Sequence, residues 1–173
     1  MRRVTAMVGA AAVVLWAATA FAQGKADFGG TWTREMPAAG AAGGGGGGGG
    51  RGGGGGGGGV FNCGMTCTIV QDAKMLTVKR TSAREGAPAP ADLVFMLDGT
   101  DSKITMGGRG GATEVVAKAK WDANKLVISA TRDMGGTMIT STQTLSIEGG
   151  KLTIVTNSGR ESATPVTATY TKG

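Results

Sequence analysis

Few residues of this chain could carry out chemistry. The sequence contains no histidine, which excludes the catalytic triads and metal sites that depend on an imidazole. A pair of carboxylates is present at Asp98 and Asp101, but it falls in a glycine-containing turn, where aspartates usually bond their own backbone rather than transfer protons. We therefore predict that the protein is not an enzyme.

The two cysteines, Cys63 and Cys67, are separated by three residues. A disulfide between them would close a small loop and needs Cα atoms within about 7 Å of each other. A metal clip is the alternative, but two cysteines without histidine are a weak zinc signal. We predict a local disulfide with a structural role, and neither a bound metal nor a cofactor.

The first 22 residues are typical of a secretory signal peptide. Arg2 and Arg3 precede an uncharged apolar stretch over residues 6–18, and Ala20 and Ala22 provide the small residues of a cleavage site. The stretch is shorter than the roughly 20 apolar residues that span a membrane. We expect cleavage after Ala22, a mature domain over residues 23–173 in the periplasm or outside the cell, and no membrane span.

Charge does not point to a nucleic-acid partner. Removal of residues 1–22 takes away two arginines and no acid, which lowers the formal net charge from +6 to +4. The remaining basic residues are scattered, apart from Lys79 and Arg80, so no basic patch is expected to face a phosphate backbone. Residues 107–111 are glycine-rich around Arg109, but they lack the lysine and hydroxyl residue of a phosphate-binding loop.

A glycine tract interrupts the mature domain. Residues 43–59 consist of glycine and Arg51, and glycine has no side chain to bury and loses the most conformational entropy on ordering. We predict a disordered insertion over residues 38–60, which would act as a flexible linker.

The rest of the mature chain alternates between apolar and polar residues with a period of two. In the segment 113–121, Val115, Ala117 and Trp121 share one face while the lysines face the other way, as in a half-buried strand. Similar alternation recurs before and after it, and no helical periodicity of useful length is present.

Polar turn residues separate these alternating runs at near-regular intervals. Residues 121–128 and 147–154 have closely matched hairpin patterns, 70–78 has one residue more, and 97–104 is looser. Four hairpins and a first strand over residues 30–34 give eight to ten strands. We predict an all-β fold, an antiparallel up-and-down meander that closes into a barrel and so avoids exposed edges.

The opening of the first strand carries a family resemblance. Gly30 and Trp32 form a G-x-W motif that resembles the start of lipocalin-like barrels, in particular those of uncharacterised bacterial exported proteins. The hairpins at 121–128 and 145–154 are similar to theirs. The resemblance implies that Gly30, Trp32 and Trp121 are structural, that Trp32 packs across the closed end, and that the glycine tract lies at the open mouth.

Two polar residues fall on a face that we expect to look inward. Ser141 and Gln143 alternate with apolar residues of the segment 137–147, and buried polar groups need partners. A ligand, water or a neighbouring strand could satisfy them. The side chains expected to line the interior are Leu93, Phe95, Val115, Ala117, Ile128, Ile139, Gln143 and Tyr170.

Two functions fit these patterns. The first is an exported, non-enzymatic lipocalin-like barrel that binds a small apolar ligand. The alternative is a structural or interaction module of the cell envelope, with a filled core and the glycine tract as a spacer for contacts with proteins or surfaces. Small eight-stranded barrels can be filled with side chains or hold a ligand, so the architecture does not choose between them.

Overall fold

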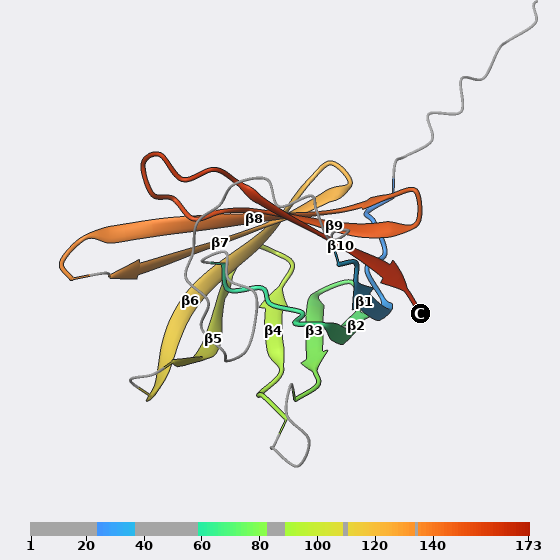
Figure 1. Cartoon of the computed structure of the whole chain (residues 1–173), viewed down its shortest axis with the longest axis horizontal. Coiled ribbons are helices and arrows are strands. Elements are labelled where there is room, and N and C mark those ends of the chain that lie inside the picture. The colour runs from blue at the N-terminus through green and yellow to red at the C-terminus, as the bar shows by residue number, and fades with distance from the viewer. Residues whose placement is uncertain (1–23, 37–58, 83–88, 109–110, 134) are drawn as a thin grey trace, which may run out of the picture.

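Antiparallel strands make up nearly all the regular structure of the chain (Figure 1). The computed structural model describes residues 24–36, 59–82, 89–108, 111–133 and 135–173. The strands are β1 (Gly30–Arg34), β2 (Thr66–Gln71), β3 (Met75–Arg80), β4 (Leu93–Met96), β5 (Asp101–Gly108), β6 (Gly111–Asp122), β7 (Lys125–Asp133), β8 (Met138–Glu148), β9 (Lys151–Asn157) and β10 (Val166–Lys172).

A single sheet contains all ten strands, in the order β4-β3-β2-β1-β10-β9-β8-β7-β6-β5. Each strand is antiparallel to its neighbours, and β1 pairs with β10, so the first and the last strand lie side by side. The all-β, up-and-down meander is therefore confirmed, and the first strand has the predicted bounds. Its strands enclose a space, here called the bore.

The alternation in the sequence matches the burial of the side chains. Along β7, residues Leu126, Ile128 and Ala130 are buried while their neighbours are partly or fully exposed. Because successive side chains in a strand point to opposite faces, one face of each strand supplies the bore and the other meets solvent.

Three of the four expected hairpins are present. Gln71 pairs with Leu76, Trp121 with Leu126, and Ile147 with Leu152. In the last of these, Gly149 and Gly150 both have left-handed φ values, 58° and 76°, the conformation that a two-residue hairpin turn requires.

The fourth expected hairpin, over residues 97–104, is wrong. This turn connects β4 to β5, which are the two edges of the sheet, and no backbone ladder joins them in the described parts of the chain. The edges nevertheless come together (Figure 1), and the Met96 amide donates a hydrogen bond of 2.8 Å to Oγ of Ser102, which is buried. The meander thus closes into a barrel by contact between its edge strands.

The segment before β1 covers one end of the bore. The Phe28 ring stacks on Trp121 of β6, with centroids 5.9 Å apart, and the Phe28 carbonyl accepts a 2.8 Å hydrogen bond from Nε1 of Trp32. The carboxamide of Gln71 accepts from the Phe28 amide and donates to the Ala26 carbonyl, each at 3.0 Å. Trp32 is therefore buried at this end of the barrel. Trp121 is half-buried, and its ring stacks on that of Phe28.

Gly30, the other residue of the motif, is fixed by its backbone. Its φ of +130° is rarely adopted by residues with a side chain, and an added Cβ would lie 2.5 Å from Cε of Lys172. Because Cε belongs to the flexible end of the Lys172 side chain and can move, the φ of Gly30 is the reason that this position favours glycine.

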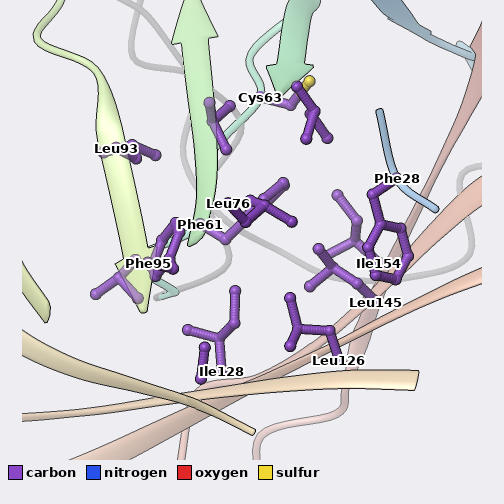
Figure 2. Close-up of a cluster of buried hydrophobic side chains, with 14 of the residues drawn as sticks. Phe28, Phe61, Cys63, Leu76, Leu93, Phe95, Leu126, Ile128, Leu145 and Ile154 are labelled. Atoms are coloured by element: carbon purple, nitrogen blue, oxygen red, sulfur yellow. The ribbon is translucent and has the colours of Figure 1, made fainter. Parts of the chain in front are cut away.

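The expected insertion over residues 38–60 needs a shorter boundary. Residues 37–58 lie outside the described residues, but Val60 is buried, with 2% of its surface exposed. The packed chain therefore begins again by Val60, which belongs to the apolar cluster of the bore. Figure 2 shows part of that cluster, including Phe61 and Phe95.

Trp32→Phe should destabilise the fold more than Trp121→Phe. The first change leaves the buried Phe28 carbonyl without its donor, which costs about 1–3 kcal/mol. The second removes an Nε1 that is buried and has no hydrogen-bond partner among the described residues. The free energy of unfolding of the two variants in urea measures the difference, and equal losses would contradict the role assigned to the Trp32 hydrogen bond.

Candidate functional site

The eight side chains expected to line the interior all lie on inward faces. Seven of them are buried and Ile139 is half-buried. They come from β4, β6, β7, β8 and β10, and strand pairing places Ile128 opposite Gln143, and Ala117 opposite Ala130. The structure thus brings the six expected apolar residues other than Ile139 into one core cluster. Ile139 lies outside that cluster, near Gly159.

Gln143 is a buried polar residue within the bore. Its side chain lies on β8 and is 3% exposed. Its Oε1 accepts a hydrogen bond of 2.6 Å from the Phe61 amide, and its Nε2 donates to the Phe61 carbonyl at 2.9 Å and to Oγ1 of Thr156 at 3.1 Å. Both sides of the carboxamide are therefore bonded to the chain itself.

Phe61 belongs to a segment that enters the bore without joining the sheet. Residues 59–63, here called the inner segment, precede β2 and contain no strand. The Phe61 side chain is 4% exposed, and its ring stacks on that of Phe95 with centroids 5.9 Å apart (Figure 2). The inner segment thus occupies the place where a ligand would meet both the apolar wall and Gln143.

Phe61 is not among the residues that were expected to line the interior. Val60 and Phe61 lie between the glycine tract and Cys63, in no alternating run. One feature of the sequence could have indicated Val60 and Phe61: they are two apolar residues close to Cys63, which was expected to form a disulfide.

Gly59 allows the inner segment to approach the carboxamide. A Cβ added at Gly59 would collide with the end of the Gln143 side chain. Because both polar atoms of that side chain are already bonded, it cannot turn away without losing hydrogen bonds. The last residue of the glycine tract is therefore required by packing as well as by chain flexibility.

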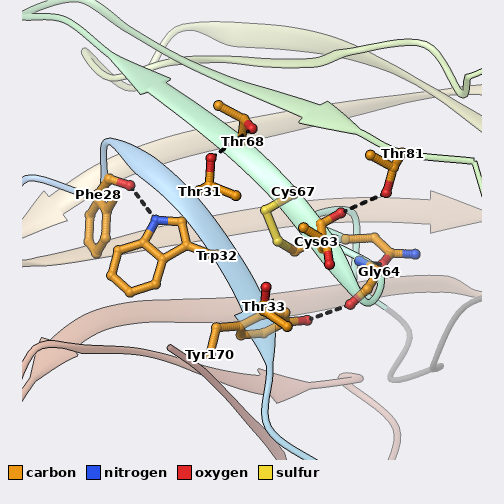
Figure 3. The surroundings of a disulfide bond; sticks show 12 residues. Phe28, Thr31, Trp32, Thr33, Cys63, Gly64, Cys67, Thr68, Thr81 and Tyr170 are labelled. Carbon is orange, nitrogen blue, oxygen red and sulfur yellow. Dashed lines mark hydrogen bonds between the residues drawn. A yellow bond between two sulfur atoms is a disulfide. The ribbon is translucent and has the colours of Figure 1, made fainter. Parts of the chain in front are cut away.

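A disulfide holds the other end of the inner segment (Figure 3). Cys63 is bonded to Cys67 of β2, with Cα atoms 5.1 Å apart, and both residues are buried. The following residue, Gly64, accepts a hydrogen bond from the Tyr170 hydroxyl at 3.3 Å. The predicted disulfide is confirmed, and it ties the inner segment to the wall.

The two inward polar residues that needed partners both find them within the protein. Gln143 bonds the inner segment, and Oγ of Ser141 donates to the Ala130 carbonyl of β7 at 3.4 Å. A neighbouring strand and an inner segment, rather than a bound molecule, satisfy them in this structure.

The paired aspartates serve other purposes. Asp98 accepts hydrogen bonds from the amide and the hydroxyl of Thr100, at 2.9 and 2.6 Å, and these bonds lower the pKa of Asp98. Asp101 forms a 3.0 Å ion pair with Lys118. These contacts are those of the expected turn and of an exposed ion pair.

Two hollows on the described surface lie away from Gln143. One of about 400 Å³ is bordered by Lys25, Asp27, Gln71 and Trp121 at the end that Phe28 covers. The other, of about 610 Å³, is bordered by residues of β5 to β8, including Val115. Of the residues expected to line the interior, Val115 alone borders either of them.

Comparisons with known proteins give a structural likeness only. No protein-family model and no curated protein matches this chain. A mutant of the fluorescent protein UnaG, a solved structure, is similar over 62% of this chain and 70% of that chain, with 20% sequence identity and a TM-score of 0.47. The topology described above therefore rests on the strands of this chain itself. Within the described ranges, no helix has the length and apolarity needed to cross a membrane.

Loss of the disulfide should lower stability. The five-residue loop from Cys63 to Cys67 is short, and the chain-entropy model gives such a crosslink about 2 kcal/mol. Urea unfolding with and without reductant measures this, after mass spectrometry has shown that the oxidised chain is two hydrogens lighter. Cys63→Ala/Cys67→Ala is the control and should not respond to reductant. A reduced wild-type chain with an unchanged urea midpoint would contradict the prediction.

Stability should also fall at alkaline pH through Tyr170, the single tyrosine of the chain. Burial raises the pKa of its phenol, and the charge of Arg34 only partly opposes this. A pKa raised in the folded state means that the stabilisation is complete below the unfolded value of about 10 and is lost as the pH rises through the folded value. Phenolate absorbance follows Tyr170 directly. Tyr170→Phe should lose less stability over the same pH range, and parallel pH profiles would contradict the assignment.

Proposed function

We propose that the chain is an exported, non-enzymatic β-barrel protein of the cell envelope that binds a small, largely apolar molecule in its bore. The observation that carries this proposal is the Gln143 carboxamide, a buried polar group in a largely apolar space. Small-molecule sites are typically apolar walls with a few well-placed polar groups that fix the orientation of the ligand.

The contacts that hold the inner segment in the bore support the proposal that a ligand can replace this segment. The hydrogen bonds of the Phe61 backbone go to a single side chain, Gln143, and not to a strand ladder. Its ring stacks on Phe95. A ligand that offered the same hydrogen bonds and ring contact would replace those that Phe61 makes. Release of the segment would return the conformational entropy of its residues, which offsets part of the cost of exposing the buried Val60 and Phe61 side chains to water.

The proposed location rests on two features of the sequence and structure. Residues 1–22 have the pattern of a signal peptide, and disulfides such as Cys63–Cys67 persist in oxidising compartments outside the cytoplasm.

The complete bonding of Gln143 also favours the second candidate function, a structural or interaction module. In that function the inner segment is a permanent part of the core, and the barrel presents its outer surface to envelope proteins. The two functions differ in whether Phe61 can be replaced.

Truncation of Phe61 should open the ring position beside Phe95 and weaken the hold of the inner segment, whose backbone alone then bonds Gln143. Phe61→Ala removes the ring that stacks on Phe95, so the neutral, apolar dye Nile red should bind at least about tenfold more tightly than to the wild type, because an internal competitor reduces apparent affinity. Fluorescence titration measures this, with circular dichroism as a check of folding. Phe61→Leu, which keeps most of the apolar volume, is the matched control and should bind the dye less well than Phe61→Ala.

Native mass spectrometry of the protein from its own host provides the independent test. A reproducible small molecule that leaves on unfolding would support the binding function. A bare mass, together with a Phe61→Ala variant that binds no dye, would leave the filled interaction module.

A further inference from the structure

The bore holds its own inner segment by contacts that define a chemical class of ligand. We infer that the molecule bound at Gln143 is a neutral aromatic amide, that is, a flat ring system with an N–H donor beside a carbonyl acceptor. This inference rests on the proposed function and specifies the ligand that the site takes.

The hydrogen bonds give the first requirement. Gln143 meets Phe61 with an acceptor and a donor together: Oε1 faces the Phe61 amide at 2.6 Å and Nε2 faces the Phe61 carbonyl at 2.9 Å. The second N–H of Nε2 is directed to Thr156 on the neighbouring strand, which fixes the carboxamide plane. A replacement ligand must therefore present one donor and one acceptor side by side, because an unmatched group would leave a buried polar atom without a partner.

The buried polar groups give the second requirement. Among the described residues, the buried polar side chains are Ser102, Ser141, Gln143, Ser146 and Thr156. None of them is charged, and the groups that bond Gln143 are all neutral, so a charged ligand would find no counter-ion among the partners of Gln143. Transfer of an unpaired charge out of water into such a space is strongly unfavourable. The ligand is therefore neutral where it contacts Gln143.

The shape of the inner segment gives the third requirement. At Phe61 it places an aromatic ring 5.9 Å from the ring of Phe95, with an angle of 29° between the ring planes. At Gly59, next to the carboxamide, it has no side chain and no room for one. A departing segment would vacate the volume of the buried Val60 and Phe61 side chains and would leave no room on the Gly59 side of the carboxamide, which suits an aromatic amide that is unsubstituted on that side.

A matched pair of compounds tests this class. 2-Quinolinone and coumarin are neutral bicyclic molecules of the same shape, and they differ at the ring position beside the carbonyl, which is N–H in the first and oxygen in the second. The full mature chain with Phe61→Ala should bind 2-quinolinone at least about tenfold more tightly than coumarin by calorimetry, since sites built to bond a donor discriminate against analogues that lack it.

Substitution of the carboxamide should abolish this preference. Adding Gln143→Met to Phe61→Ala keeps the length of the side chain and removes both polar partners, so the two compounds should then bind equally. Adding Gln71→Met instead is the matched control. It removes the other carboxamide, which bonds Ala26 and Phe28 at the covered end, and the preference should be unchanged.

The outcomes separate this inference from the proposed function. Equal binding of the two compounds with Gln143 in place would overturn the ligand class, while Nile red binding would still support a ligand barrel. If neither compound nor the dye binds, both proposals fail. If Phe61→Ala does not fold, NMR of the wild type with excess compound decides, because 2-quinolinone should shift the side-chain amide signals of Gln143 and coumarin should not.

Discussion

The Gln143 carboxamide lies inside an apolar barrel, and the packing of the bore depends on how its hydrogen bonds are met. Each of its polar atoms, if buried without a partner, would cost about 1–3 kcal/mol, a large share of the 5–15 kcal/mol by which a small domain is stable. The Phe61 backbone meets both atoms. This requirement brings residues 59–63 into the bore, where the Phe61 ring reaches Phe95.

Two irregular segments of the chain are held in a similar way. At one end Gln71 binds the backbone of Ala26 and Phe28, and within the bore Gln143 binds the backbone of Phe61. In each instance a glutamine side chain replaces the strand ladder that an irregular segment lacks, because every buried backbone N–H and carbonyl needs a partner. The disulfide of Cys63 then limits how far the inner segment can move from β2.

Much of the fold could be predicted because its signals are local. The alternation of apolar residues has the period of a strand, so the inward face of β6 and β7 was readable residue by residue, and the turn at Gly149 and Gly150 was readable from composition. The prediction of a hairpin at 97–104 was wrong because the turn residues there resemble those of the three turns that do join paired strands. Whether two successive strands pair depends on where the sheet ends, and that is decided by the curvature of all ten strands.

The sequence by itself determined the all-β meander, the first strand, the inward position of Gln143 and the proximity of Cys63 to Cys67, because each depends on neighbours within a few residues. Only the tertiary structure decided that β4 and β5 are the two edges of the sheet, and that Phe61 satisfies Gln143. These two residues are 82 positions apart in the chain. No sequence periodicity links Phe61 with Gln143. They meet because the closed barrel leaves space in the bore for an apolar segment, and the buried carboxamide of Gln143 requires the hydrogen bonds that this segment offers.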